Sequence, residues 1–176
     1  MTNVELNDFM LIEVAVKSKG GNFDITWGER QIDEEDEAIY PHVKSWLLPR
    51  DLNIVLPELV TEFAKYVRQF AGFSENDEIE ITKVKFFTTV DGNGHKELYD
   101  IDIHCKITNR GDKPAVYNTG RKTISNITLG EPQDYNDLNA LIIDIELNTY
   151  QFAIEGKRFK PELKKFEIES DGKVQF

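Results

Sequence analysis

The clearest pattern of hydrophobic and polar positions lies in Glu97–Thr108, where apolar and polar residues alternate. The apolar series runs through every second position from Tyr99 to Ile107, and the positions between are polar. A period of two places the two kinds of side chain on opposite faces of a β-strand. The segment therefore predicts a strand with one dry face and one solvated face, and another part of the fold must cover the dry face.

A long hairpin is predicted around this strand. Asp91–Gly94 has the composition of a tight turn and separates Glu78–Val90 from Lys96–Thr108. The two segments are therefore expected to pair at the centre of a sheet. In the first of them the apolar positions change parity near Thr82–Lys83, which predicts a β-bulge there.

Further strands are expected towards both ends of the chain. Phe9–Val16 is strongly apolar, and Phe23–Trp27 alternates after a glycine-containing turn, which predicts another hairpin. Phe166–Glu169 and Lys173–Phe176 predict a closing hairpin. Tyr40–Leu56 is aromatic and interrupted by prolines, so we expect an extended connector lying over the core.

A one-sided amphipathic helix is predicted over about residues 57–71. Pro57 suits its first turn and Gly72 its end. The apolar residues at helical spacing are Leu59, Val60, Phe63, Val67 and Phe70.

A second helix is predicted over about residues 134–155, and it has two apolar faces. Asp134 or Asn136 suits its start and Gly156 its end. At about 100° per residue, one face consists of Leu138, Leu141, Ile142, Ile145 and Phe152. The opposite face consists of Ile143, Leu147, Tyr150 and Ile154. We expect the first face to pack on the sheet.

The second face of this helix predicts an additional contact, because exposed apolar patches are typical of interaction sites. Within the chain, that contact would come from the helix 57–71 or the connector 40–56. Alternatively, a second copy of the chain would meet the helix across a two-fold axis. We expect a homo-oligomer with an interface at Ile143, Leu147, Tyr150 and Ile154.

Together these elements predict a single α+β domain over residues 1–176. It would contain a mainly antiparallel sheet of about five to seven strands, packed by the two helices. The hairpin of Glu78–Val90 and Lys96–Thr108 would lie at its centre.

Composition narrows the possible functions. The chain has 176 residues and a net charge of −11, which argues against general nucleic-acid binding because phosphate contacts require Lys and Arg. A single cysteine, Cys105, excludes an internal disulfide framework, and its place on the apolar strand face predicts a buried thiol. Met1–Ile12 lacks a basic start, and no apolar run reaches the roughly 20 residues of a membrane helix. We expect a soluble cytoplasmic protein without membrane contact.

Asp100, Asp102 and His104 form a candidate metal site. They alternate along the solvated face of the predicted strand, and two carboxylates with an imidazole are suitable ligands for Mg²⁺, Mn²⁺ or Zn²⁺. Such a metal would activate water, so the pattern is consistent with a metal-dependent phosphoesterase. It is equally the composition of an ordinary solvated strand face.

Two basic segments, residues 106–122 and 157–165, stand out in the acidic chain. If they met in the fold, they would form a small phosphate- or nucleotide-binding pocket. The candidate ligand-binding residues are Asn118, Thr119, Arg121, Lys122, Lys157 and Arg158. Salt bridges to the acidic remainder are the simpler interpretation.

The sequence contains no nucleophile motif and no dinucleotide fingerprint, so we expect no catalytic residues and no cofactor. The leading hypothesis is a non-catalytic acidic binding or assembly protein, acting through a protein partner or self-association. A basic protein is a possible partner. In that case the carboxylate run Asp33–Glu37 would contribute to an inhibitor or nucleic-acid mimic.

Overall fold

A computed structural model describes residues 5–17, 22–32, 38–48, 53–90, 96–123 and 132–159. Within these ranges the elements are η1 (Leu6–Asp8), β1 (Phe9–Val16), β2 (Phe23–Ile32), β3 (Ala38–Leu48), α1 (Val55–Thr61), α2 (Phe63–Ala71), β4 (Ile79–Val90), β5 (Lys96–Ile107), β6 (Ala115–Asn118), β7 (Lys122–Thr123) and α3 (Pro132–Ala153). The acidic run 33–37 and the predicted closing hairpin lie outside the described residues. The predicted α+β class is confirmed.

The strands of the described residues form one antiparallel sheet in the order β3-β2-β1-β4-β5-β6, with β7 also pairing with β5. The predicted hairpin of β4 and β5 is confirmed. Its register shifts between Ile81 and Lys83, where the bulge was expected. The middle pair of the sheet is β1 and β4, so β5 lies one strand from the centre.

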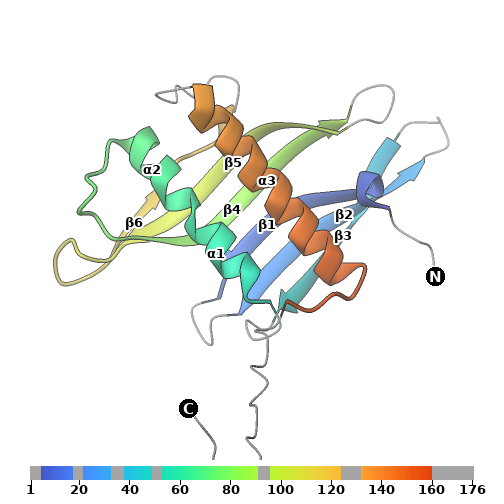
Figure 1. Cartoon of the computed structure of the whole chain (residues 1–176), viewed down its shortest axis with the longest axis horizontal. Helices are drawn as coiled ribbons and strands as arrows, with labels where there is room; N and C mark the ends of the chain where they lie inside the picture. The colour runs from blue at the N-terminus through green and yellow to red at the C-terminus, as the bar shows by residue number, and fades with distance from the viewer. Residues whose placement is uncertain are drawn as a thin grey trace, which may run out of the picture.

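All of the described α-helices lie on one face of the sheet, and α3 runs obliquely across the strands (Figure 1). The sheet presents to them a buried apolar layer formed by Phe9, Leu11, Val14, Phe23, Ile25, Trp27, Ile81, Val84, Phe86, Ile101, Ile103 and Cys105. The predicted sheet-facing residues of α3 are buried in the same core. Cys105 is fully buried, and this burial raises the pKa of its thiol, so Cys105 is a neutral core residue.

The helix predicted over residues 57–71 is observed as two consecutive helices, α1 and α2, separated by Glu62. Glu62 keeps right-handed helical backbone angles. Gly72 ends α2 as predicted. Its φ of 66° is left-handed, and the amide of Phe73 donates to the carbonyl of Arg68 at 3.1 Å.

The interpretation of Tyr40–Leu56 as a connector is wrong. Most of this segment belongs to β3, and α1 begins at Val55. Glu29 of β2 pairs with His42 and Gln31 pairs with Ile39, so Pro41 lies at a register irregularity. β3 is the last strand of the described sheet. Proline lacks an amide hydrogen, and it is tolerated at bulges and on edge strands for that reason.

A buried amide connects the start of α1 to α3. The Nδ2 of Asn53 donates to the Oδ1 of Asn148 at 2.7 Å, and both residues are buried. The Oδ1 of Asn53 accepts hydrogen bonds from the amides of Val55 and Leu56 at 3.2 and 3.0 Å. One side chain therefore caps α1 and fixes its position against α3.

A second polar link holds the α2–β4 loop against the β5–β6 turn. Arg110 donates two hydrogen bonds to the Asp77 carboxylate, at 2.8 and 2.6 Å, and the Ser74 amide donates a third at 2.8 Å. The hydrogen bonds from Arg110 are the main reason that the pKa of Asp77 lies below its ordinary value.

We expect Asn53→Ala to lower the free energy of unfolding by about 3 kcal/mol, because it removes the cap of α1 and leaves the buried Asn148 amide without this partner. Urea unfolding followed by circular dichroism measures the loss. Asn136→Ala, at an exposed position of α3, is the matched control and should change the value by less than about 0.5 kcal/mol. Equal effects of the two substitutions would contradict the role of Asn53.

We expect the contribution of Asp77 to depend on pH. Because its folded-state pKa is depressed, the ionised carboxylate stabilises the fold above the unfolded pKa of about 3.9, and this stabilisation is lost as the pH falls through the folded pKa. The difference in unfolding free energy between the parent and Asp77→Asn should therefore shrink below about pH 4. Urea titrations over a pH series measure it. Asp112→Asn, at an exposed position of the β5–β6 turn, is the control and should change the free energy of unfolding at neutral pH by less than about 0.5 kcal/mol.

Candidate functional site

The face of the sheet away from the described helices carries the predicted metal residues. Asp100 and Asp102 are buried on this face of β5, and His104 is half-buried. Asp100 accepts a hydrogen bond from the Arg121 guanidinium, whose centre lies 4.3 Å from the ring centroid of Phe87. Burial alone would raise the pKa of Asp100, but hydrogen bonds from Thr123 and Arg121 outweigh it and lower the pKa. Asp100 is therefore paired with a cation of its own chain.

Asp102 and His104 form a separate pair. The Nε2 of His104 lies 3.1 Å from the Oδ2 of Asp102, and the Nδ2 of Asn118 lies 3.3 Å from the same ring nitrogen. The buried Oδ1 of Asp102 has no hydrogen-bond partner within the described residues. In that part of the chain no three His, Cys, Asp or Glu side chains are grouped so that they could hold a metal ion. The structure thus brings Asp102 to His104 but directs Asp100 to Arg121.

The residues of the first basic segment shape the turn between β6 and β7. The Thr119 hydroxyl accepts from the Ile103 amide at 3.0 Å and donates to the Gly120 carbonyl at 2.9 Å. The Oδ1 of Asn118 accepts from the Gly120 amide at 2.6 Å. Lys122 begins β7 and pairs with Ile101. Most of these polar groups therefore already have partners in the turn or on the neighbouring strand β5.

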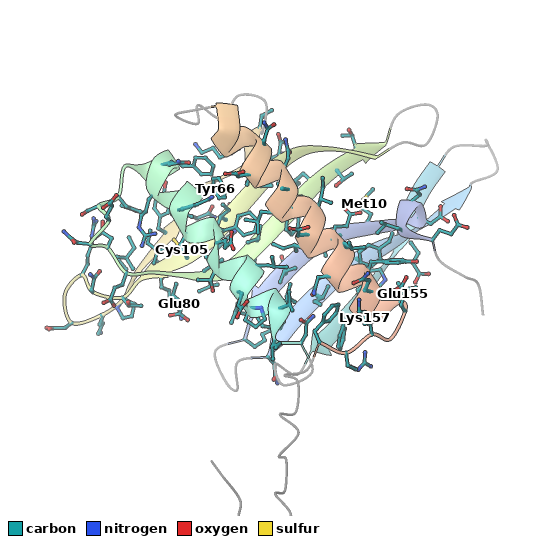
Figure 2. The ribbon with its side chains drawn as sticks, viewed as in Figure 1. Met10, Tyr66, Glu80, Cys105, Glu155 and Lys157 are labelled. Atoms are coloured by element: carbon teal, nitrogen blue, oxygen red, sulfur yellow. The ribbon has the colours of Figure 1, made fainter. Side chains whose placement is uncertain are left out.

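The second basic segment lies elsewhere. Lys157 and Arg158 follow α3, and the Arg158 guanidinium lies 4.3 Å from the ring centroid of Phe152. Figure 1 shows β6 at one end of the sheet. Figure 2 shows Lys157 beside the C-terminal end of α3, away from β6. Residues 160–165 lie outside the described residues. The described parts of the two segments do not meet in a common pocket.

The outer face of α3, predicted as an interface, is divided between the interior and the surface. Phe9 covers one part of it, because its ring centroid lies 5.6 Å from that of Tyr150 and 6.1 Å from that of Trp27. Ile154 is also partly buried against the core. Ile143 and Leu147, in contrast, are 64% and 37% exposed.

The exposed part of α3 adjoins η1. Leu6 is 38% exposed, and together with Ile143 and Leu147 it lines a groove of about 240 Å³. We call these three residues the α3–η1 patch. Asn7 and Glu146 complete the lining of the groove. The helical periodicity indicated Ile143 and Leu147 but not Leu6, because the periodicity of a helix does not show which distant segment lies beside it.

Carboxylates of the two elements also act on Tyr150 of α3. Burial raises the pKa of the Tyr150 hydroxyl, and the charges of Glu155, Glu5 and Asp8 raise it further. Among the residues that line the groove itself, Glu146 is the carboxylate. Asp144, next to Ile143 in sequence, is exposed as well.

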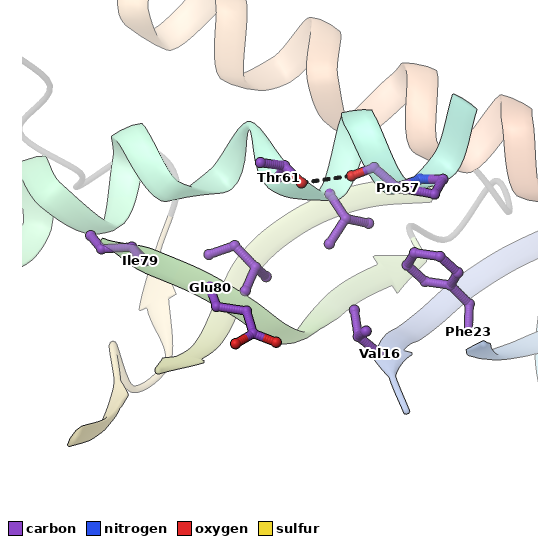
Figure 3. Close-up of a pocket in the computed structure, with 8 residues that line it drawn as sticks. Val16, Phe23, Pro57, Thr61, Ile79 and Glu80 are labelled. Atoms are coloured by element: carbon purple, nitrogen blue, oxygen red, sulfur yellow. Dashed lines mark hydrogen bonds between the residues drawn. The ribbon is translucent and has the colours of Figure 1, made fainter. Parts of the chain in front are cut away.

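A second cavity, of about 270 Å³, lies between α1 and the ends of three strands (Figure 3). Its apolar wall consists of Val16, Phe23, Pro57, Val60, Ile79 and Ile81, and Thr61 and Glu80 complete the lining. The Thr61 hydroxyl donates to the Pro57 carbonyl at 2.8 Å, so it already has a partner. This cavity could not be predicted from local sequence patterns, because its residues come from four separate elements.

Comparison of the chain with models of known protein families, with curated proteins and with solved structures finds no match. Among the described helices, none has both the length and the apolar content to cross a membrane.

Two isoleucines of α3 test the division of its faces. Ile145 is fully buried, whereas Ile143 is 64% exposed. We expect Ile145→Gln to lower the free energy of unfolding by at least about 3 kcal/mol, because it removes apolar contacts and buries an amide. Ile143→Gln should change it by less than about 0.5 kcal/mol. Urea unfolding of both variants measures the difference, and a large loss at Ile143 would place that residue in the core.

Proposed function

We propose that this chain is a non-catalytic binding protein and that it contacts another protein through the α3–η1 patch. The observation that carries the proposal is the exposure of Ile143 and Leu147 on a helix whose opposite face is buried in the core. A single exposed apolar residue requires no explanation. Here three of them adjoin and line one groove, which is the arrangement that suits an anchoring side chain of a partner.

The position of the patch supports the same proposal. α3 is held against the sheet by its buried face and against α1 by the Asn53–Asn148 hydrogen bond. A rigid helix presents its exposed side chains in a fixed arrangement, so a partner loses little free energy in ordering them. The turns of α3 that carry Ile143 and Leu147 therefore form a prearranged surface.

The other two hypotheses have weaker geometric support. The phosphate pocket required Arg121 and Lys157 to approach each other. Arg121 is bonded to Asp100 of β5 instead, and Lys157 donates to Gln151 of α3 at 3.4 Å. The metal-dependent phosphoesterase required Asp100 to act with Asp102, and Asp100 is bonded to Arg121 instead. The binding hypothesis depends on neither arrangement.

Selection from a random peptide library displayed on phage tests the proposal. We expect enriched peptides to bind the parent chain and to lose at least about tenfold in affinity for the double variant Ile143→Gln/Leu147→Gln, since anchor residues dominate binding energy. Isothermal titration with the synthetic peptides measures the loss.

Val116→Gln is the control for this selection, because Val116 is 79% exposed on β6 and lies far from the α3–η1 patch. Its affinity for the selected peptides should equal that of the parent. The proposal fails if the enriched peptides bind the double variant as well as they bind the parent, or if no peptide is enriched.

A further inference from the structure

The cavity between α1 and the strand ends has a wall that is almost entirely apolar, and we call it the α1–β4 cavity. It measures about 270 Å³, and its lining consists of Val16, Phe23, Pro57, Val60, Thr61, Ile79, Glu80 and Ile81. Phe23, Val60 and Ile81 are at most 6% exposed and belong to the core. Apolar cavities of about 150 Å³ already bind small aromatic molecules. The α1–β4 cavity therefore has room for a ring that carries a short chain.

The two polar side chains of the lining can accept hydrogen bonds from a ligand but not donate them. The Thr61 hydroxyl donates its hydrogen to the Pro57 carbonyl at 2.8 Å, so only its oxygen lone pairs remain available. Glu80 of β4 is exposed, and a carboxylate accepts hydrogen bonds only. Figure 3 shows both side chains at the cavity. A ligand that suits them carries donor hydrogens at its polar end.

Glu80 carries the charge of this lining. Within the described part of the chain, no hydrogen bond or ion pair engages its carboxylate. The β4–β5 register places Lys106 opposite Glu80, but no salt bridge joins these two described residues. Lys17 and Asp24, which follow Val16 and Phe23 in sequence, lie 3.3 Å apart and offset each other. The charge at the cavity therefore disfavours an anionic ligand.

We propose that the α1–β4 cavity binds a small primary amine with an apolar body. The hydrocarbon part lies against Phe23, Val60 and Ile81, and the ammonium group lies beside the Glu80 carboxylate. A primary ammonium group has three donor hydrogens and a positive charge, so it matches a lining that offers acceptors and one carboxylate. The cavity shares no lining residue with the α3–η1 patch, so this binding site is additional to the proposed function.

Apolar contact supplies most of the affinity. Because Glu80 is exposed, its ion pair with the ligand contributes little, and the charge acts mainly on selectivity. A ligand of about nine non-hydrogen atoms should bind with a dissociation constant of roughly 0.1–1 mM. The amine should bind about threefold more tightly than an uncharged molecule of the same shape.

Three ligands of one shape test the proposal: phenethylamine, phenethyl alcohol and phenylacetate. They share the ring and differ in the charge of the polar end. Nitrogen-15 NMR titration of the parent chain with phenethylamine should give saturable shifts of the Val60 and Ile81 amides. The alcohol should bind about threefold more weakly, and phenylacetate about tenfold more weakly or less, since it also meets the Glu80 charge.

A matched pair of variants separates Glu80 from the general negative charge of the chain. Glu80→Gln and Glu75→Gln each remove one exposed carboxylate. The first should bind the amine and the alcohol equally well, whereas the second should keep the preference of the parent for the amine. Ile79→Trp, at a half-buried position of the wall, should fill the cavity and abolish binding of all three ligands. Val116→Trp, on exposed β6, should leave binding unchanged.

The absence of saturable shifts with phenethylamine, or shifts confined to residues away from the cavity, would overturn the proposal. A preference for the amine that persists in Glu80→Gln would overturn the role of the carboxylate. Glu80 lies at the surface, so this comparison decides the charge selectivity even if Ile79→Trp does not fold. Loss of peptide binding at the α3–η1 patch would leave the amine result unaffected, because the two sites are tested by different ligands and different variants.

Discussion

The packing of α3 across the apolar face of the sheet is the contact on which the rest of the structure depends. Leu138 and Ile145 are fully buried there and belong to the same core as strands β1, β2, β4 and β5. Burial of a large aliphatic side chain contributes roughly 1.5–3 kcal/mol, so this face of α3 fixes the orientation of the helix about its axis. Once that orientation is fixed, Ile143 and Leu147 of the opposite apolar face point away from the core.

The path of the chain through η1 and the beginning of β1 determines how much of the opposite face of α3 is covered. η1 leads into β1, and Phe9 at the beginning of β1 lies between Trp27 and Tyr150. Phe9 thus covers the later turns of α3, and Tyr150 and Ile154 become part of the packed structure. Among the described residues, no side chain of comparable size lies over Ile143, and Leu6 forms one side of a groove there. The exposed patch is what remains of a face that the chain covers in part.

Local patterns predicted those features that depend on neighbouring residues alone. The alternation in Glu97–Thr108 predicted β5, the change of parity near Thr82 predicted the bulge, and the two apolar stripes of α3 predicted both of its faces. β3 was missed because Pro41 is a strong signal against a strand, unless it is known that the strand lies at a sheet edge and carries a bulge. That information comes only from the tertiary structure. The contact of Phe9 with Tyr150 and the pairing of Asp100 with Arg121 also depend on the tertiary structure, since neither spacing nor composition indicates them.

On the face of the sheet away from the described helices, side chains of opposite charge are neighbours. Lys83 lies 3.4 Å from Glu13, and Arg121 is bonded to Asp100. Such pairs cancel most of the field that a ligand would feel. The lining of the groove beside α3 and η1 is mainly apolar instead, so apolar contact would supply the affinity for a partner there.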